Sequence, residues 1–159
     1  MKTIDLSIKI GFCQLDELSE EEQHLIQTAI SATGNSYSPY SKFRVGAALL
    51  LANGVEVMGA NQENAAFPSG LCAERSAIFA AQSTYPDQPI TLLAIAAANE
   101  YGLMRAPIVP CGACRQVILE IESRYNQPIR ILLYGTSGVY VIDTVKDLLP
   151  LQFVGESMK

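Results

Sequence analysis

Apolar and polar residues alternate at the start of the chain. The even-numbered positions from Ile4 to Ile10 are apolar, and most positions between them are polar. Because successive side chains of a strand point to opposite faces, this period of two is typical of a half-buried strand. We therefore predict an edge strand within residues 1–12.

The next segment has the pattern of an amphipathic helix. Ser19 and Glu22 have the spacing of a capping box, and apolar residues follow at helical intervals until Gly34. His24, the only histidine, lies in the first half of this helix. A single histidine does not make a zinc site, so we expect its side chain to face solvent.

Two antiparallel strands are predicted after a loop rich in Ser and Pro. Residues 43–51 are apolar enough for a buried strand, and a second run of strand-forming residues covers 55–58. Asn53 and Gly54 separate the two runs, and this dipeptide is typical of a tight hairpin turn. The two runs are therefore expected to pair with each other.

Strands and helices alternate along the rest of the chain. Strands are predicted at 91–98, 129–134 and 139–142, and helices at 72–82, 111–121 and, as a short segment, 145–149. This alternation is typical of an α/β layered domain with a mixed sheet.

Composition narrows the classes of function. The 159 residues fit one domain, and a hydrophobic fraction of 49% supplies apolar side chains for a subunit interface as well as a core. The net charge of −5 favours a small-molecule substrate over nucleic acid, because nucleic-acid binding needs clustered Lys and Arg. No apolar stretch is long enough to span a membrane and no signal peptide is recognisable, so we expect a cytoplasmic protein with no membrane partner.

Three of the four cysteines have the spacing of a metal site. Cys111 and Cys114 form a C-x-x-C at the predicted start of a helix, which points both sulfurs toward one place beyond the helix end. Cys72 is predicted to open another helix in the same way. The positive end of each helix dipole favours ionised thiols, so a third thiolate has a physical reason to join the first two. Cys13 lies in an apolar segment, where we expect a buried, inert thiol.

The predicted metal is zinc, in a catalytic site. Three protein ligands leave tetrahedral zinc one open position for water, whereas structural sites have four ligands. A closed site with Cys13 as the fourth ligand is the alternative, and other soft divalent ions are also compatible with three thiolates.

Charged residues beside the cysteines supply further candidate chemistry. Glu74, two residues after Cys72, is placed to move a proton between bound water and a leaving amine, although any acid is favoured at a helix N-terminus. Three thiolates overcompensate the charge of a divalent ion, so a nearby cation is expected. Arg75 and Arg115 flank the ligands, and we expect at least one of them to donate hydrogen bonds to the sulfurs.

The two cysteine motifs and two other stretches resemble those of a known family. The stretches are Cys72–Arg75, Pro110–Gln116, Ser38–Ala48 and Gly59–Ala65. Together they resemble the homotetrameric cytidine deaminases whose zinc ligands are all cysteine, over residues 20–154. The resemblance implies one Zn²⁺ per subunit and a three-layer α/β/α domain with a mixed five-stranded sheet, to which the N-terminal segment would add a strand.

By this resemblance, several residues acquire roles in binding a nucleoside. Asn61 and Glu63 resemble the pair that hydrogen-bonds the ribose hydroxyls, and Phe43 resembles the aromatic residue that stacks on the pyrimidine. The Ala73 N–H would bind the carbonyl of the base, and the Val109 carbonyl would receive its amino group.

The resemblance also implies a homotetramer in which neighbouring subunits complete each active site. Residues 148–153 resemble the C-terminal segment of the family, with Phe153 as the aromatic residue that reaches into a partner's pocket. Phe67 occupies a position where relatives often carry Tyr, which puts one polar contact between subunits in doubt. Residues 1–18 are an extension that compact members lack, and residues 19–159 would form the single deaminase domain.

The implied function is hydrolytic deamination of cytidine and 2'-deoxycytidine to uridine and 2'-deoxyuridine, with release of ammonia, in pyrimidine salvage. Zinc-bound hydroxide would attack the ring carbon that bears the amine, while Glu74 relays the proton and contacts the ring nitrogen. Deamination of a nucleoside-like antibiotic such as blasticidin S is the nearest alternative, and the ribose pair Asn61 and Glu63 argues against it.

Two alternatives belong to other classes. A nucleic-acid editing deaminase would need a basic channel, which this acidic chain does not offer. A structural zinc module for protein interaction would display four ligands and no carboxylate near the metal.

Overall fold

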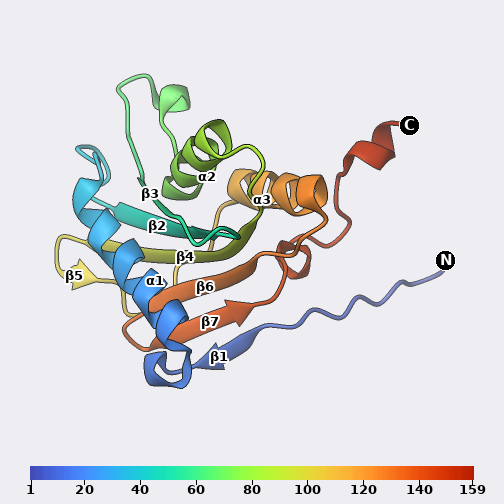
Figure 1. Ribbon diagram of the computed structural model, residues 1–159, viewed down its shortest axis with the longest axis horizontal. Helices are drawn as coiled ribbons and strands as arrows, with labels where there is room; N and C mark the ends of the chain where they lie inside the picture. Colours follow the sequence, from blue (N-terminus) through green and yellow to red (C-terminus); the bar gives the residue numbers. More distant parts are fainter.

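A mixed sheet of seven strands forms the middle layer of the protein, described over residues 1–159 in a computed structural model (Figure 1). The strands are β1 (Gly11–Cys13), β2 (Arg44–Leu51), β3 (Glu56–Ala60), β4 (Ile90–Asn99), β5 (Gly102–Leu103), β6 (Arg130–Gly135) and β7 (Gly138–Ile142). They follow the order β1-β7-β6-β4-β2-β3, with β5 paired to β4. Strands β4 and β6 pair in parallel, and all other neighbouring strands pair antiparallel.

Helices cover both faces of this sheet. Helix α1 (Glu20–Ala32) lies on one face, and α2 (Ala73–Thr84) and α3 (Gly112–Tyr125) lie on the other (Figure 1). Alternate residues of β4 face the two helical layers. Leu93 packs in the core cluster under α2 and α3, and Leu92 packs in the cluster under α1. The predicted three-layer α/β/α architecture is confirmed.

Five short 3₁₀ helices connect these elements. They are η1 (Leu15–Glu17), η2 (Thr33–Asn35), η3 (Phe67–Ser69), η4 (Val145–Leu148) and η5 (Gly155–Met158). The short helix predicted at 145–149 corresponds to η4. None of the helices has the length and hydropathy needed to span a bilayer.

The local signals at the start of α1 and in the hairpin are confirmed. Glu22 N–H donates to the Ser19 hydroxyl over 3.3 Å, and Ser19 N–H donates to the Glu22 carboxylate over 3.0 Å. Gly54 turns between β2 and β3 with a φ of 84°, a value that suits a residue without a side chain. His24 is exposed to solvent as predicted, with its Nε2 3.2 Å from a Glu56 carboxylate oxygen.

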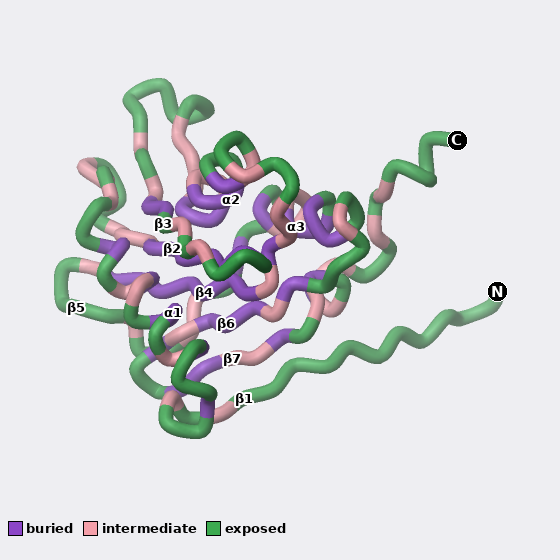
Figure 2. The backbone as a smooth tube through the Cα atoms, viewed as in Figure 1, coloured by how far each residue is buried: buried purple, intermediate pink, exposed green.

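The N-terminal strand is shorter than predicted. Only β1 joins the sheet, with Gly11 opposite Val141, whereas residues 1–10 have no regular secondary structure and are all exposed (Figure 2). The reason is geometric, because β7 ends at Ile142, one residue beyond the partner of Gly11, and offers no partner to residues before Ile10. Cys13 is half-buried rather than buried, because it lies on this outermost strand. The two-residue strand β5 was not predicted.

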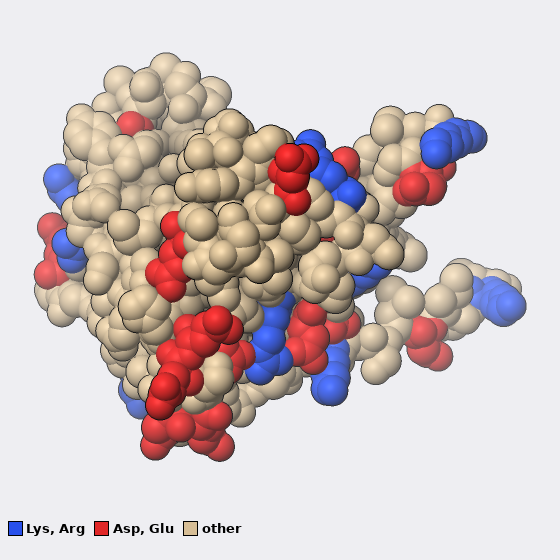
Figure 3. Space-filling model, viewed as in Figure 1, with Lys and Arg blue, Asp and Glu red and all other residues tan.

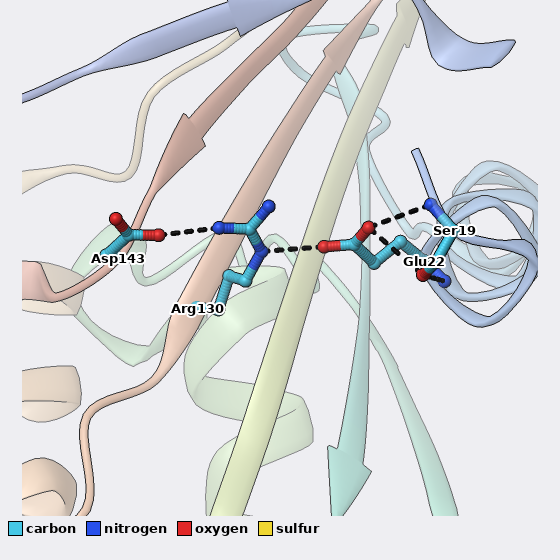
Figure 4. A network of polar contacts seen from close by, with 4 residues as sticks. All are labelled: Ser19, Glu22, Arg130 and Asp143. Carbon is cyan, nitrogen blue, oxygen red and sulfur yellow. Dashed lines mark hydrogen bonds and ion pairs between the residues drawn. The ribbon is translucent and has the colours of Figure 1, made fainter. Parts of the chain in front are cut away.

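A charged network fastens α1 to the sheet (Figure 4). Arg130 of β6 donates through Nε to Glu22 and through Nη1 to Asp143, in both cases over 2.6 Å. Burial on its own would raise the pKa of Glu22, but hydrogen bonds from Arg130 and Ser19 outweigh it and hold this pKa below its usual value. Other acidic residues gather near the start of α1 (Figure 3).

Candidate active site

Three cysteine sulfurs meet where α2 and α3 begin. Cys72 is the N-cap of α2, Cys111 is the N-cap of α3, and Cys114 lies in the first turn of α3. Cys72 Sγ lies 3.8 Å from Cys111 Sγ, which lies 3.6 Å from Cys114 Sγ. Tetrahedral zinc with Zn–S bonds of about 2.3 Å separates its sulfur ligands by about 3.8 Å. The donor set and its spacing therefore fit a zinc ion.

Cys13 is not part of this cluster, which consists of Cys72, Cys111 and Cys114. All four cysteines are free thiols. A site with three protein ligands keeps one tetrahedral position open, as catalytic zinc sites do, so the alternative of a closed four-cysteine site is not supported.

Arg75 supplies positive charge to the thiolates. Its Nη2 donates to Cys72 Sγ over 3.4 Å. Hydrogen bonding with Cys114, aided by Arg75, lowers the pKa of the Cys72 thiol to about 5. Hydrogen bonding with Cys72 and burial both raise the pKa of Cys114.

Arg115, the second arginine beside the ligands, donates to backbone carbonyls. Its Nε donates to the Pro110 carbonyl oxygen and its Nη1 donates to the Leu148 carbonyl oxygen, both over 2.9 Å. These bonds tie the segment before Cys111 to the end of η4. The expected hydrogen bond to a sulfur is therefore made by Arg75, whereas Arg115 binds two backbone carbonyl oxygens.

Glu74 is a buried carboxylic acid in the first turn of α2, only 5% exposed. Burial raises its pKa above the usual value, and the negative charge on Cys72 raises it further. A carboxyl group with a raised pKa exchanges protons closer to neutral pH, which suits general acid–base catalysis.

The cluster opens into a cavity of about 330 Å³. Its walls are Ser41, Phe43, Val45, Asn61, Glu63, Cys72, Ala73, Glu74, Ile108, Val109 and Cys111. The predicted ribose pair, the aromatic residue, the proton shuttle and two ligands are therefore brought together around one space. The volume lies within the range that holds small-molecule ligands.

The side chain of Asn61 is engaged within its own chain. Its amide oxygen accepts from Val45 N–H over 2.8 Å and from the Ser36 hydroxyl over 2.5 Å, and its nitrogen donates to the Phe43 carbonyl over 2.9 Å. One amide N–H is left for another acceptor. Asn61 thus holds the segment around Phe43 in place.

Glu63 is organised by the loop before β2. Its carboxylate accepts hydrogen bonds from the backbone N–H of Tyr40 over 2.8 Å and of Ser41 over 3.3 Å, and from the Ser41 hydroxyl. The bond from the Ser41 hydroxyl, with smaller contributions from the two N–H groups, lowers the pKa of Glu63, so the group is an anionic acceptor. Ser41 is a site residue that sequence reasoning missed, although it lies inside a recognised motif.

Phe67 and Phe153 lie outside this cavity. Phe67 is 73% exposed and contacts Tyr40 edge to face at a ring separation of 5.6 Å, in an adjoining cavity of about 480 Å³. Phe153 is 58% exposed, and its carbonyl accepts a hydrogen bond from Gln116 over 2.9 Å. The adjoining cavity shares Asn61, Glu63 and Cys72 with the first, so Phe67 lies next to the site, whereas Phe153 lines neither cavity.

Hydrolytic removal of an amine needs a metal with an open position for water and an acid–base group beside it. The three cysteines and the buried Glu74 supply both. The chain belongs to the zinc-dependent hydrolytic deaminases. The family described as "Cytidine and deoxycytidylate deaminase zinc-binding region" matches residues 19–126. The chain is a member of that family.

Individual relatives agree with this assignment. A cytidine deaminase of Halalkalibacterium halodurans is 40% identical over 138 residues, which are 87% of this chain and 98% of the relative. A cytidine deaminase of Sporosarcina psychrophila is 40% identical over 136 residues, or 86% of this chain and 93% of the relative. The crystal structure of a cytidine deaminase from Burkholderia pseudomallei superposes with a TM-score of 0.71 at 34% identity, covering 86% of this chain and all of that one (100%).

Proposed function

We propose that the chain hydrolyses cytidine and 2'-deoxycytidine to uridine and 2'-deoxyuridine, with release of ammonia, and serves pyrimidine salvage. The observation that carries the proposal is the single cavity in which Glu74 and two cysteine ligands face Phe43, Asn61 and Glu63. Its lining combines acid–base and metal-binding groups with a ring and polar groups suited to a nucleoside. Relatives named cytidine deaminases support the choice of substrate.

Zinc, when bound, supplies a Lewis acid that lowers the pKa of water at the open ligand position. The Glu74 carboxylate would accept one proton from the attacking water and pass it to the ring nitrogen. It would then carry the second proton, from the new hydroxyl group on the ring carbon, to the departing amine as the C–N bond breaks and the carbonyl forms. Water supplies the oxygen of the product, and the amine leaves as ammonia, so atoms and charge balance. The raised pKa of Glu74 favours this two-way transfer.

The rest of the cavity orients the nucleoside. The Ala73 N–H, at the first position of α2, has no acceptor within its helix and would bind the carbonyl of the base. The Val109 carbonyl would receive the amino group, and Phe43 would stack on the ring. Glu63 would accept a hydrogen bond from a ribose hydroxyl, with the remaining N–H of Asn61 beside it.

A comparison of amine substrates tests this assignment. Turnover of cytidine, 2'-deoxycytidine, cytosine and blasticidin S is measured for the zinc-loaded chain and for Glu63→Gln. We expect nucleoside turnover, weak turnover of cytosine, and a KM for cytidine about 10-fold or more higher in Glu63→Gln, because the charged acceptor is lost. Efficient turnover of blasticidin S with none of cytidine would contradict the substrate assignment.

We also propose a homotetramer whose neighbouring subunits complete each site. Leu151 is 89% exposed and Phe153 is 58% exposed on a C-terminal segment that projects from the body of the subunit (Figure 1), so their apolar surface is available to a second copy. Residues 19–159 would act as the single catalytic domain, and four free thiols suit a reducing cytoplasm. A Phe153→Ala variant that keeps the mass and turnover of the parent would contradict the role of this segment.

A further inference from the structure

The N-terminal arm, residues 3–10, has the sequence pattern of an amphipathic strand and pairs with no strand of its own subunit. Every even-numbered position is apolar, and the odd-numbered positions are Thr, Asp, Ser and Lys. The aliphatic side chains are exposed: Ile4 by 75%, Leu6 by 58%, Ile8 by 53% and Ile10 by 45%. The arm runs away from the body as an extended chain (Figures 1 and 2). Exposed apolar side chains in such a regular pattern indicate a docking surface.

The arm starts from a fixed anchor. Phe12 packs edge to face on Tyr140 at a ring separation of 5.6 Å. Gly138 makes room for this ring, because a Cβ at that position would collide with Phe12. Strand β1 pairs with β7 on one side only and is the last strand of the sheet on that edge. Its outer backbone groups are therefore available to another strand.

We propose that the arms of two copies pair with each other as antiparallel strands about a two-fold axis at Ser7. In this register Asp5 of each copy lies opposite Lys9 of the other. The apolar positions then also meet, with Ile4 opposite Ile10 and Leu6 opposite Ile8. One arrangement thus matches both opposite charges and keeps all aliphatic side chains on one face.

Charge decides between the possible pairings. Parallel arms in register would place Asp5 against Asp5 and Lys9 against Lys9, which is unfavourable. The antiparallel pair forms two Asp–Lys contacts instead, and the positive and negative side chains along the arm are visible in Figure 3. A self-complementary segment of this kind suits the two-fold symmetry of most protein dimers. The two sheets would join through β1, which needs no contact at the active site.

Cysteine cross-linking tests the register in the full-length, zinc-loaded chain. In the proposed pair, Ser7→Cys places two thiols directly opposite each other, within the distance of about 7 Å between Cα atoms that a disulfide allows. Thr3→Cys is the matched control, because its two copies would lie about 26 Å apart in the same ribbon. We expect mild oxidation to link Ser7→Cys into covalent dimers at least about 10-fold faster than Thr3→Cys or the parent. Equal rates, or no dimer from Ser7→Cys, would overturn the proposal.

Charge reversal in the Ser7→Cys background tests the opposed charges. Asp5→Lys alone places Lys against Lys twice, so the cross-linking rate should fall several-fold, and Asp5→Lys with Lys9→Asp should restore it. A double variant that stays as slow as the single one would overturn the register. Cytidine turnover is followed in every variant and should not change, so a failure of the arm pairing is distinguishable from a failure of the proposed enzymatic function.

Discussion

A methyl group on Gly59 would lie 2.5 Å from the carbonyl oxygen of Ala73 and would collide with the backbone nitrogen of Ala77. Strand β3 and the first turn of α2 therefore pack with no space for a side chain. Because Cys72 directly precedes Ala73, this close approach fixes where one zinc ligand lies relative to the sheet. The active site thus depends on a glycine that carries no chemistry.

Gly59→Ala should displace the start of α2. We expect a loss of about 1–3 kcal/mol in the free energy of unfolding, the usual cost of overpacking, together with easier removal of zinc by a chelator. Gly34→Ala is the control, because nothing lies within 4 Å of its Cβ position. Denaturant titration and chelator competition measure the two effects. Equal stability of the two variants would show that α2 does not need this close approach.

Glu22→Gln should lower the free energy of unfolding only at pH values at which the Glu22 carboxylate of the parent is ionised. The pKa of Glu22 is lowered in the folded chain from an ordinary value of 4.5. Its stabilisation is therefore present above about pH 4.5 and is lost as the pH falls through the folded pKa. We expect the variant to be about 1 kcal/mol less stable at pH 7.

The pH dependence of this difference checks the assignment. Unfolding curves of the parent and of Glu22→Gln should converge once the pH has fallen below the folded pKa of Glu22, where both side chains are neutral. Glu21→Gln, an exposed change in the same helical turn, should have little effect. A difference that persists at low pH would mean that packing, and not the charge paired with Arg130, is responsible.

Arg75→Gln should make zinc retention more sensitive to acid. Arg75 donates to the Cys72 sulfur over 3.4 Å and helps to lower the pKa of that thiol. Without it, protons should compete with zinc at higher pH, because a thiol must be deprotonated to bind metal. We expect the midpoint of zinc release to move to higher pH, as followed with a colorimetric zinc indicator.

Arg115→Gln serves as the comparison for Arg75→Gln. Arg115 donates to the carbonyls of Pro110 and Leu148 and not to sulfur, so the midpoint of zinc release should move less than in Arg75→Gln. Identical shifts in the pH midpoint of zinc release for the two variants would mean that the hydrogen bond from Arg75 to Cys72 has no special role in keeping zinc bound.

The parts of this protein that could be predicted from sequence are those with local causes. The Ser19 cap, the Asn53–Gly54 turn and the helices that begin at Cys72 and Cys111 depend on neighbouring residues, and each is confirmed. The clustering of the three sulfurs was predictable because helix N-termini stabilise thiolates and because the C-x-x-C spacing of Cys111 and Cys114 is typical of zinc sites.

The rest depends on contacts between distant segments. The hydrogen bonds of Arg115 to Leu148 and of Asn61 to Phe43 join residues that no local pattern relates. The length of β1 is set by where β7 ends, so the alternation that continues to Ile4 predicted a longer strand than the subunit can pair. Tertiary geometry, and not residue type, decides such features.

Ammonia release from cytidine by the zinc-loaded chain, compared with that of zinc-loaded Glu74→Gln, tests the central claim most directly. The account predicts turnover by the parent and a loss of about 10²–10⁴-fold in kcat for the variant, the range typical of removing a general acid–base group, at equal zinc content. A zinc-loaded, folded parent that releases no ammonia, or a Glu74→Gln variant as active as the parent, would contradict it.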